Sequence, residues 1–174
     1  MVNSLESVIR EHPFFNNFPE NQLQIITSCA KNVEFPEGHF IVLEGDAANE
    51  FYFIRKGSVS IELNIPQRGP TTMQTVGEGE ILGWSWVSPP YLWHFNAKAL
   101  ERTKALVFDA TCLRAKCEQN HDLGYEMLKR FANLITARLD ATRLQLLDIY
   151  RLDDGSKPLV KKNSKPVRTA KAAR

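Results

Sequence analysis

The sequence changes its pattern near residues 32 and 109, and the segment between these points restricts the possible folds more than any other feature. Most of the nine glycines lie in it, among turn residues that separate short apolar runs. Runs of strand length, rich in aromatic and β-branched residues, lie at 40–43, 51–54, 59–63 and 105–108. Turns are expected at 36–38, 45–46, 56–57, 69–70 and 77–79. Many short strands with regular turns indicate a sandwich, barrel or jelly roll rather than a parallel α/β sheet.

Both flanks of this segment follow a helical pattern. Before residue 32, apolar side chains recur at helical spacing at Leu23, Ile26 and Ala30. Asp109 is a suitable N-cap, so a short helix is predicted from there to Glu118. A longer helix is predicted over 122–151, with a length of about 45 Å from the usual rise per residue.

These patterns predict an α+β fold, mainly β, with a jelly roll between N-terminal helices and a long C-terminal dimerisation helix. A length of 174 residues fits one compact domain with an extension. The expected segments are N-terminal helices at 1–32, a β-roll at 33–109, C-terminal helices at 110–151 and a basic tail at 152–174.

The long helix carries two apolar stripes. One has the alternating four-and-three spacing of a heptad seam and consists of Leu128, Ala132, Ile135, Leu139, Thr142, Leu146 and Ile149. On another face lie Met127, Phe131 and Leu134, which we expect to pack on the roll. A helix of a monomer needs only one buried stripe. The second stripe therefore predicts a homodimer.

The tail concentrates positive charge. The whole chain has a formal net charge of +2, whereas residues 155–174 hold only basic charged residues. A segment with so few apolar residues cannot fold alone. It can bind an acidic partner, or nucleic acid nonspecifically through the release of counterions. The alternative is a solvated end without a partner.

The order of elements resembles the cyclic-nucleotide-binding domains of the catabolite activator protein (Crp/Fnr-like) superfamily. The glycine-marked turns at 36–46 and 51–61 and the stretch 78–83 carry the resemblance, which covers about residues 5–150. It implies a double-stranded β-helix β-roll and a regulatory role. Relatives often continue into a helix-turn-helix domain, but the tail has no apolar period that would supply a recognition helix. We therefore expect a stand-alone domain.

The phosphate-binding cassette departs from the pattern of this family. The resemblance implies that backbone amides after Gly83, at the start of a short helix, bind the cyclic phosphate. Binders usually place a glutamate directly after this glycine for the ribose, and an arginine about ten residues further on for the phosphate. Trp84 and Trp93 stand at these positions. Because an indole has one donor and no charge, tight binding of cyclic AMP or cyclic GMP is not expected.

Two interpretations of this aromatic cassette remain open. The tryptophans either line a pocket for a small ligand or fill the nucleotide site and close it. For the first case, the candidate ligand residues are Leu82, Gly83, Trp84, Ser85, Trp86, Trp93, His94, Asn96 and Lys98. Arg138, Thr142 and Arg143 are candidates for contacts from the long helix.

Catalysis is not expected. The histidines at positions 12, 39, 94 and 121 are far apart and form no metal-binding spacing. No nucleophile stands in a recognisable catalytic motif. We predict no catalytic residue, no metal and no cofactor.

The cysteines and the apolar runs bear on the compartment. Cys29, Cys112 and Cys117 show no metal or redox spacing, so we interpret them as free thiols. No apolar run has the length of a secretory signal core or a membrane span. The sequence thus predicts a cytoplasmic protein without a membrane partner.

Two functions are consistent with these observations. In the first, a homodimeric sensor binds a small ligand at the cassette and relays this event to the dimer helix. In the second, a scaffold without a ligand binds protein partners through the roll, the dimer helix and the basic tail.

Overall fold

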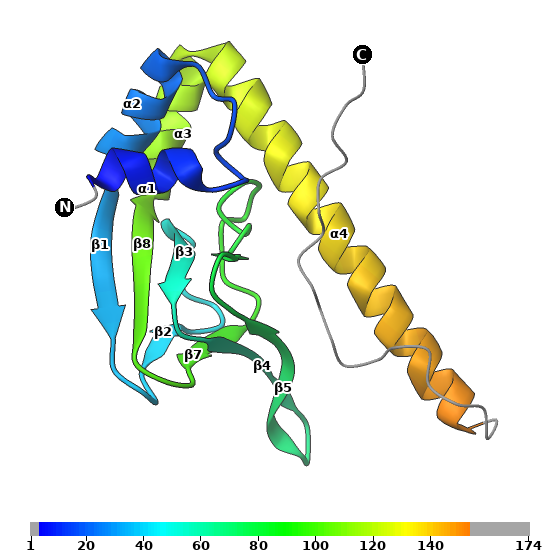
Figure 1. The fold of residues 1–174 in the computed structure, drawn as a ribbon. Coiled ribbons are helices and arrows are strands. Elements are labelled where there is room, and N and C mark those ends of the chain that lie inside the picture. The colour runs from blue at the N-terminus through cyan, green and yellow to red at the C-terminus, as the bar shows by residue number, and fades with distance from the viewer. Residues whose placement is uncertain (1–3, 154–174) are drawn as a thin grey trace. The chain divides into compact units, whose positions relative to one another are not determined.

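The computed structural model describes residues 4–153, and the side chains up to Asp148. It divides into two units, residues 1–132 and 133–174. The first unit contains both sheets, three helices and the beginning of the fourth helix (Figure 1). The basic tail predicted at 152–174 lies outside the described residues from 154 onward.

The first unit is built on two four-stranded antiparallel sheets that do not close into a barrel. The strands are β1 (Ala30–Phe35), β2 (Phe40–Val42), β3 (Glu50–Lys56), β4 (Val59–Ile65), β5 (Gly69–Val76), β6 (Ile81–Leu82), β7 (Asn96–Ala99) and β8 (Thr103–Asp109). One sheet has the order β1-β8-β3-β6, and the other has the order β2-β7-β4-β5. Neighbouring strands are therefore often distant in sequence, as a jelly roll requires. The predicted β-roll is confirmed.

Helices precede and follow the roll, as predicted. They are α1 (Leu5–Glu11), α2 (Glu20–Ser28), α3 (Ala110–Gln119) and α4 (His121–Asp153). The Asp109 side chain accepts a hydrogen bond from the backbone amide of Cys112 at 2.8 Å. This bond satisfies one of the free amides at the start of α3, so the predicted N-cap is confirmed.

Two local expectations were wrong. Ala30 continues the apolar helical period, but it begins β1 and pairs with Phe108. Residues 69–70 were expected in a turn, whereas they begin β5. The turn lies at 66–68 instead. Pro70 is tolerated in β5 because this strand is the edge of its sheet, where a missing amide hydrogen needs no partner.

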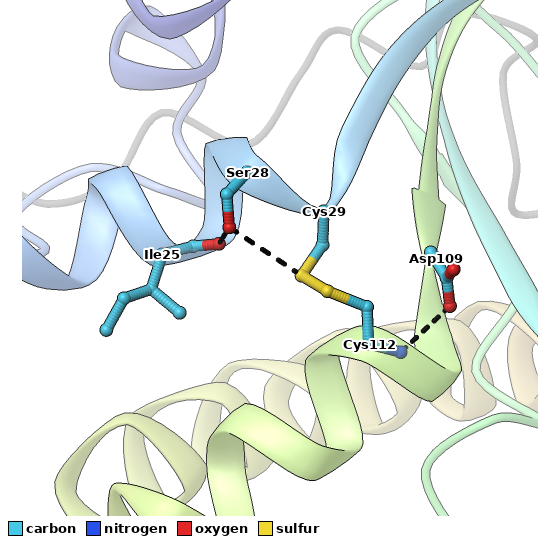
Figure 2. Close-up of a disulfide and its surroundings, with 5 residues drawn as sticks. All are labelled: Ile25, Ser28, Cys29, Asp109 and Cys112. Atoms are coloured by element: carbon cyan, nitrogen blue, oxygen red, sulfur yellow. Dashed lines mark hydrogen bonds between the residues drawn. A yellow bond between two sulfur atoms is a disulfide. The ribbon is translucent and has the colours of Figure 1, made fainter.

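The interpretation of all three cysteines as free thiols was also wrong. Cys29 and Cys112 form a disulfide across 83 residues of sequence (Figure 2). Pairing of β1 with β8 brings the end of α2 beside the start of α3, and the amide of Asp109 donates to the carbonyl of Cys29 at 2.8 Å. This proximity is tertiary, so cysteine spacing could not reveal it. Cys117 is a free thiol and is half-buried.

An aromatic core joins the sheets to the beginning of α4. The Phe51 ring stacks on Phe108 at 4.6 Å between centroids and on Trp86 at 5.0 Å. Phe131 of α4 meets Phe51 edge-on at 5.4 Å. Met127 and Phe131 are buried, so the predicted packing of these two residues on the roll is confirmed. Leu134, the third member of the predicted stripe, is half-buried and lies in the second unit.

The second unit, as described, is the remainder of α4. Its exposed apolar side chains are Leu139, Leu144, Leu146 and Leu147. Two members of the predicted seam lie in the first unit: Leu128 and Ala132, both exposed. The side chain of Ile149 lies outside those described. None of the described helices is long and apolar enough to cross a membrane.

Candidate functional site

The cassette runs from the end of β6 to the beginning of β7 and is built of turns. Gly83 follows β6 with a positive φ of 98°. Residues 85–90 then form turns and bends, so the short helix expected after Gly83 is absent from this described segment. Pro89 and Pro90 lack the amide hydrogens that a helix would use, which accounts for the difference.

Backbone hydrogen bonds tie the cassette to the loop between β2 and β3. Trp93 donates its amide hydrogen to the carbonyl of Asp46 at 2.8 Å and accepts from the amide of Gly45 at 2.8 Å. The amide of Ala48 donates to the carbonyl of Tyr91 at 2.7 Å. These bonds fix the position of Trp93.

The Trp93 ring lies directly on Gly83. A Cβ atom added to Gly83 would lie 2.8 Å from Cζ3 of Trp93, closer than carbon atoms approach. Trp93 is only 3% exposed, and its ring meets Phe95 edge-on at 5.5 Å. Trp84 is half-buried, with its ring centroid 6.3 Å from that of Phe95. The Trp93 ring therefore occupies the space next to Gly83.

The polar candidates of the cassette have separate environments. Ser85 is buried, whereas His94 is exposed. The side-chain oxygen of Asn96 accepts a hydrogen bond from the amide of Glu44 at 2.9 Å. The ammonium of Lys98 lies 5.4 Å from the centroid of the Phe40 ring. Asn96 and Lys98 thus already have partners within the protein.

A cavity of about 280 Å³ adjoins Trp93, and its lining is acidic. Asp46, Glu50 and Asp109 contribute to it. The Tyr52 hydroxyl, also in the lining, donates to Glu50 at 2.6 Å. Burial, together with this carboxylate, raises the pKa of Tyr52 well above its ordinary value. Three carboxyl groups make this cavity unfavourable for a phosphate.

A second cavity, of about 370 Å³, lies between the cassette and the helices that follow the roll. The cassette supplies Trp86, Val87 and Tyr91. From α3 and α4 come Arg114, Cys117, Glu118, His121, Gly124, Met127, Leu128 and Phe131. Burial raises the pKa of the Cys117 thiol, and Glu118 contributes to this shift. Of this lining, the sequence identified only Trp86 as a ligand residue, because the rest comes together through tertiary structure.

The candidates on the long helix belong to the second unit. There the Thr142 hydroxyl donates to the carbonyl of Arg138 at 2.9 Å, and Arg143 forms an ion pair with Asp140 at 3.3 Å. Contacts from Arg138, Thr142 and Arg143 to a ligand stay a prediction. No group of three or more potential metal ligands occurs among residues 4–148.

Comparison with known proteins decides the family. The family model of the cyclic nucleotide-binding domain matches residues 32–120, just over half of the chain. The chain belongs to the cyclic nucleotide-binding domain family. The match begins in β1 and ends at Asn120, directly after α3, so it includes the whole cassette.

Solved structures of such domains share the fold. A candidate cyclic nucleotide-binding protein from Geobacter metallireducens is 25% identical, with a TM-score of 0.71, and the match covers 80% of this chain and 99% of that one. A cyclic nucleotide-binding domain from Methylobacillus flagellatus is 22% identical, with a TM-score of 0.70 and coverage of 82% and 80%.

A curated relative of this cyclic nucleotide-binding domain is a regulator. The CRP-like cAMP-activated global transcriptional regulator of Mycobacterium tuberculosis is 20% identical over 149 residues, or 86% of this chain. The chain spans 65% of the length of that regulator. The cyclic nucleotide-binding domain described here is thus similar to a regulatory protein.

Proposed function

We propose that this chain is a homodimeric regulatory module that binds a small ligand at its aromatic-rich cassette and relays this event to the dimer helix. Cyclic AMP and cyclic GMP are not bound tightly in this proposal. The observation that carries the exclusion of these nucleotides is the contact of Trp93 with Gly83, which fills the cassette where the cyclic phosphate would approach the backbone. A charge-assisted hydrogen bond contributes roughly 1.5–3 kcal/mol. Without the carboxylate and the guanidinium, nucleotide binding weakens by about a hundredfold or more.

Aromatic contacts support a link from the cassette to α4. Trp86 stacks on Phe51 and meets Phe131 edge-on at 5.1 Å between ring centroids. All three residues are buried, and close packing leaves little room for one ring to move without the others. A ligand that displaces Trp86 would therefore change how the beginning of α4 seats on the roll, which biases a two-state equilibrium.

Exposed leucines on α4 support the dimer. Leu128, Leu139 and Leu146 lie on the predicted seam and are 56%, 48% and 52% exposed. A row of large apolar side chains at heptad spacing is unfavourable in water and is stabilised by a second copy of the same helix. In a twofold dimer each of these residues would face the same stripe of its partner.

A scaffold without a ligand is the second candidate function. The filled cassette favours it, because a domain that lost its ligand would retain the roll and the exposed helix. Binding of an acidic partner or of nucleic acid through the tail belongs to this candidate and falls outside the described residues. A cytoplasmic location is part of both proposals.

A thermal-shift screen separates the two candidates. Cyclic AMP, cyclic GMP and a set of small organic acids are each added at about 100 times the dissociation constant expected for a weak ligand, which raises stability by about 2.7 kcal/mol for a specific binder. The sensor proposal predicts a rise in melting temperature with at least one organic acid and none with the nucleotides. No rise with any compound supports the scaffold instead.

A further inference from the structure

We propose that the cavity between the cassette and helices α3 and α4 is the ligand site of this domain, and that it takes a small aromatic carboxylate. This inference rests on the proposed regulatory function and names its ligand class. The site lies on residues 86–131, entirely within the first unit, and does not use the space that Trp93 fills.

The walls of this cavity suit a flat apolar body. Trp86, Met127 and Phe131 are buried side chains that line it, and Tyr91 adds a fourth large side chain. The volume of about 370 Å³ falls within the range of small-molecule pockets, roughly 300–1,000 Å³. An aromatic ring system would pack against these surfaces.

Arg114 supplies a positive charge held by neutral groups. Its guanidinium lies 4.6 Å from the centroid of the Tyr91 ring and donates to the carbonyl of Trp86 at 3.1 Å. It also donates to the side chains of Asn49 at 3.4 Å and Thr111 at 3.3 Å. Among the described residues, no carboxylate lies within ion-pair distance of Arg114. Its charge is thus oriented by neutral contacts and remains available to an anion.

Glu118 is the acidic residue that contributes to this lining. Its side chain is exposed, so water and salt screen its charge, whereas Arg114 is half-buried. Of these two opposite charges, the less screened one is the positive charge of Arg114, so the cavity wall attracts a carboxylate more strongly than a cation.

Trp86 adds an unused donor. The residue is 4% exposed, and its indole Nε1 has no hydrogen-bond partner among the described residues. A buried donor without an acceptor is unfavourable, and few remain in folded proteins. In this proposal, a carboxylate oxygen in the cavity that Trp86 lines supplies this acceptor.

A ligand in this cavity would contact both the cassette and α4, the two elements that the proposed relay connects. Trp86 belongs to the cassette and contacts Phe131 of α4. Leu128 lines the cavity and also begins the predicted dimer seam. Occupation of the cavity would therefore fix the cassette against α4 and change the surface that the partner helix meets.

The test uses 2-naphthoate as the probe and neutral 2-naphthamide as its isostere, with calorimetry as the measurement. We expect 2-naphthoate to bind at least tenfold more tightly than the amide, because only the acid pairs with Arg114. Arg114→Gln should weaken naphthoate binding about tenfold or more and leave amide binding unchanged. Lys116→Gln removes the same charge from an exposed position of the same helix and should change neither.

Cys117 gives an independent readout in the unaltered protein. It is the free thiol of the chain and lines the cavity, so bound 2-naphthoate should slow its alkylation by N-ethylmaleimide severalfold. Equal binding of acid and amide, equal binding to wild type and Arg114→Gln, or an unchanged alkylation rate at saturation would each overturn the assignment. Such a failure leaves the regulatory proposal standing, because its thermal-shift screen depends on neither Arg114 nor naphthoate.

Discussion

At Gly83 the backbone has a φ of 98°, and Trp93 covers the place where a side chain would begin. Both facts favour glycine at position 83. A left-handed conformation is strained for a residue with a Cβ atom, and the indole of Trp93 leaves no space for that atom. The resemblance assigned Trp93 to the position of the usual arginine. It could not show that the ring lies on the glycine, because this contact depends on how residues 84–92 turn.

Gly83→Ala should therefore destabilise the domain by about 2–4 kcal/mol, from backbone strain together with overpacking. Gly38→Ala is the matched control, since Gly38 has a φ of 81° with nothing within 4 Å of an added Cβ, and it should cost only about 1 kcal/mol. Urea unfolding measures both differences. Equal losses for the two variants would mean that Trp93 does not press on Gly83.

His12 is a buried titratable residue between α1 and the roll. It is 8% exposed, and its Nε2 hydrogen is donated to the carbonyl of Gly79 at 2.9 Å, while Nδ1 accepts from the amide of Phe14 at 3.2 Å. Burial lowers the pKa of His12 below its ordinary 6.5, although the Gly79 carbonyl opposes this shift. The folded state thus holds the neutral ring.

Acid should destabilise the domain through His12. As the pH falls below about 6.5, the unfolded chain takes up a proton that the folded chain does not, so the free energy of unfolding decreases until the pH passes the lowered pKa. Urea unfolding at about pH 7 and pH 5 should show a larger decrease for wild type than for His12→Gln. Parallel decreases would show that His12 is not the group responsible.

At the scale of elements, the sequence pattern predicted four of the eight strands and the long helix. The runs at 40–43, 51–54, 59–63 and 105–108 became β2, β3, β4 and β8, and the helix predicted over 122–151 became α4. These signals are local, because a strand or helix must bury one face. The cassette was harder to predict, since its turns and the cavity behind it depend on residues far apart in sequence.

The seam of α4 supports a prediction for assembly. Replacement of Ile135 and Leu139 by Lys should convert a dimer to monomers, because like charges would face each other across the interface. Ala137→Lys with Leu144→Lys adds the same charge at exposed positions off the seam and should leave the dimer intact. Sedimentation velocity measures both variants. A dimer that survives the seam substitutions would exclude this interface.

For the whole molecule, the disulfide joins the two helical flanks of the roll. Cys29 and Cys112 are 83 positions apart in the sequence, and all eight strands lie between them. A crosslink over a loop of this length restricts the unfolded chain strongly. The cysteine pattern of the sequence gave no sign of it, because only the pairing of β1 with β8 brings the two residues together.

Replacement of both Cys29 and Cys112 by Ala should lower the free energy of unfolding by about 2–4 kcal/mol. Dithiothreitol should destabilise the wild-type protein to a similar extent and have no effect on this double variant. Cys117→Ala, which removes the free thiol, is the control and should respond to dithiothreitol like wild type. Urea unfolding that is insensitive to dithiothreitol in all three proteins would contradict the role of the disulfide.

The central claim for the whole molecule is that a cyclic nucleotide-binding fold carries a cassette unsuited to a cyclic nucleotide. The resemblance assigns Trp84 and Trp93 to the positions of the usual charged pair. Trp93 fills the space next to Gly83, and the cavity beside it is lined by Asp46 and Glu50. Each of these features opposes the binding of a phosphate.

Calorimetry with cyclic AMP measures whether this cassette binds a cyclic nucleotide. Titration of the wild-type protein to about 1 mM nucleotide should give no saturable heat, because the expected dissociation constant lies well above the micromolar range. The same titration with cyclic GMP should give the same result. Saturable binding with a micromolar dissociation constant would show that the cassette does accept a cyclic nucleotide, since Trp93 would have to leave Gly83 and admit the cyclic phosphate.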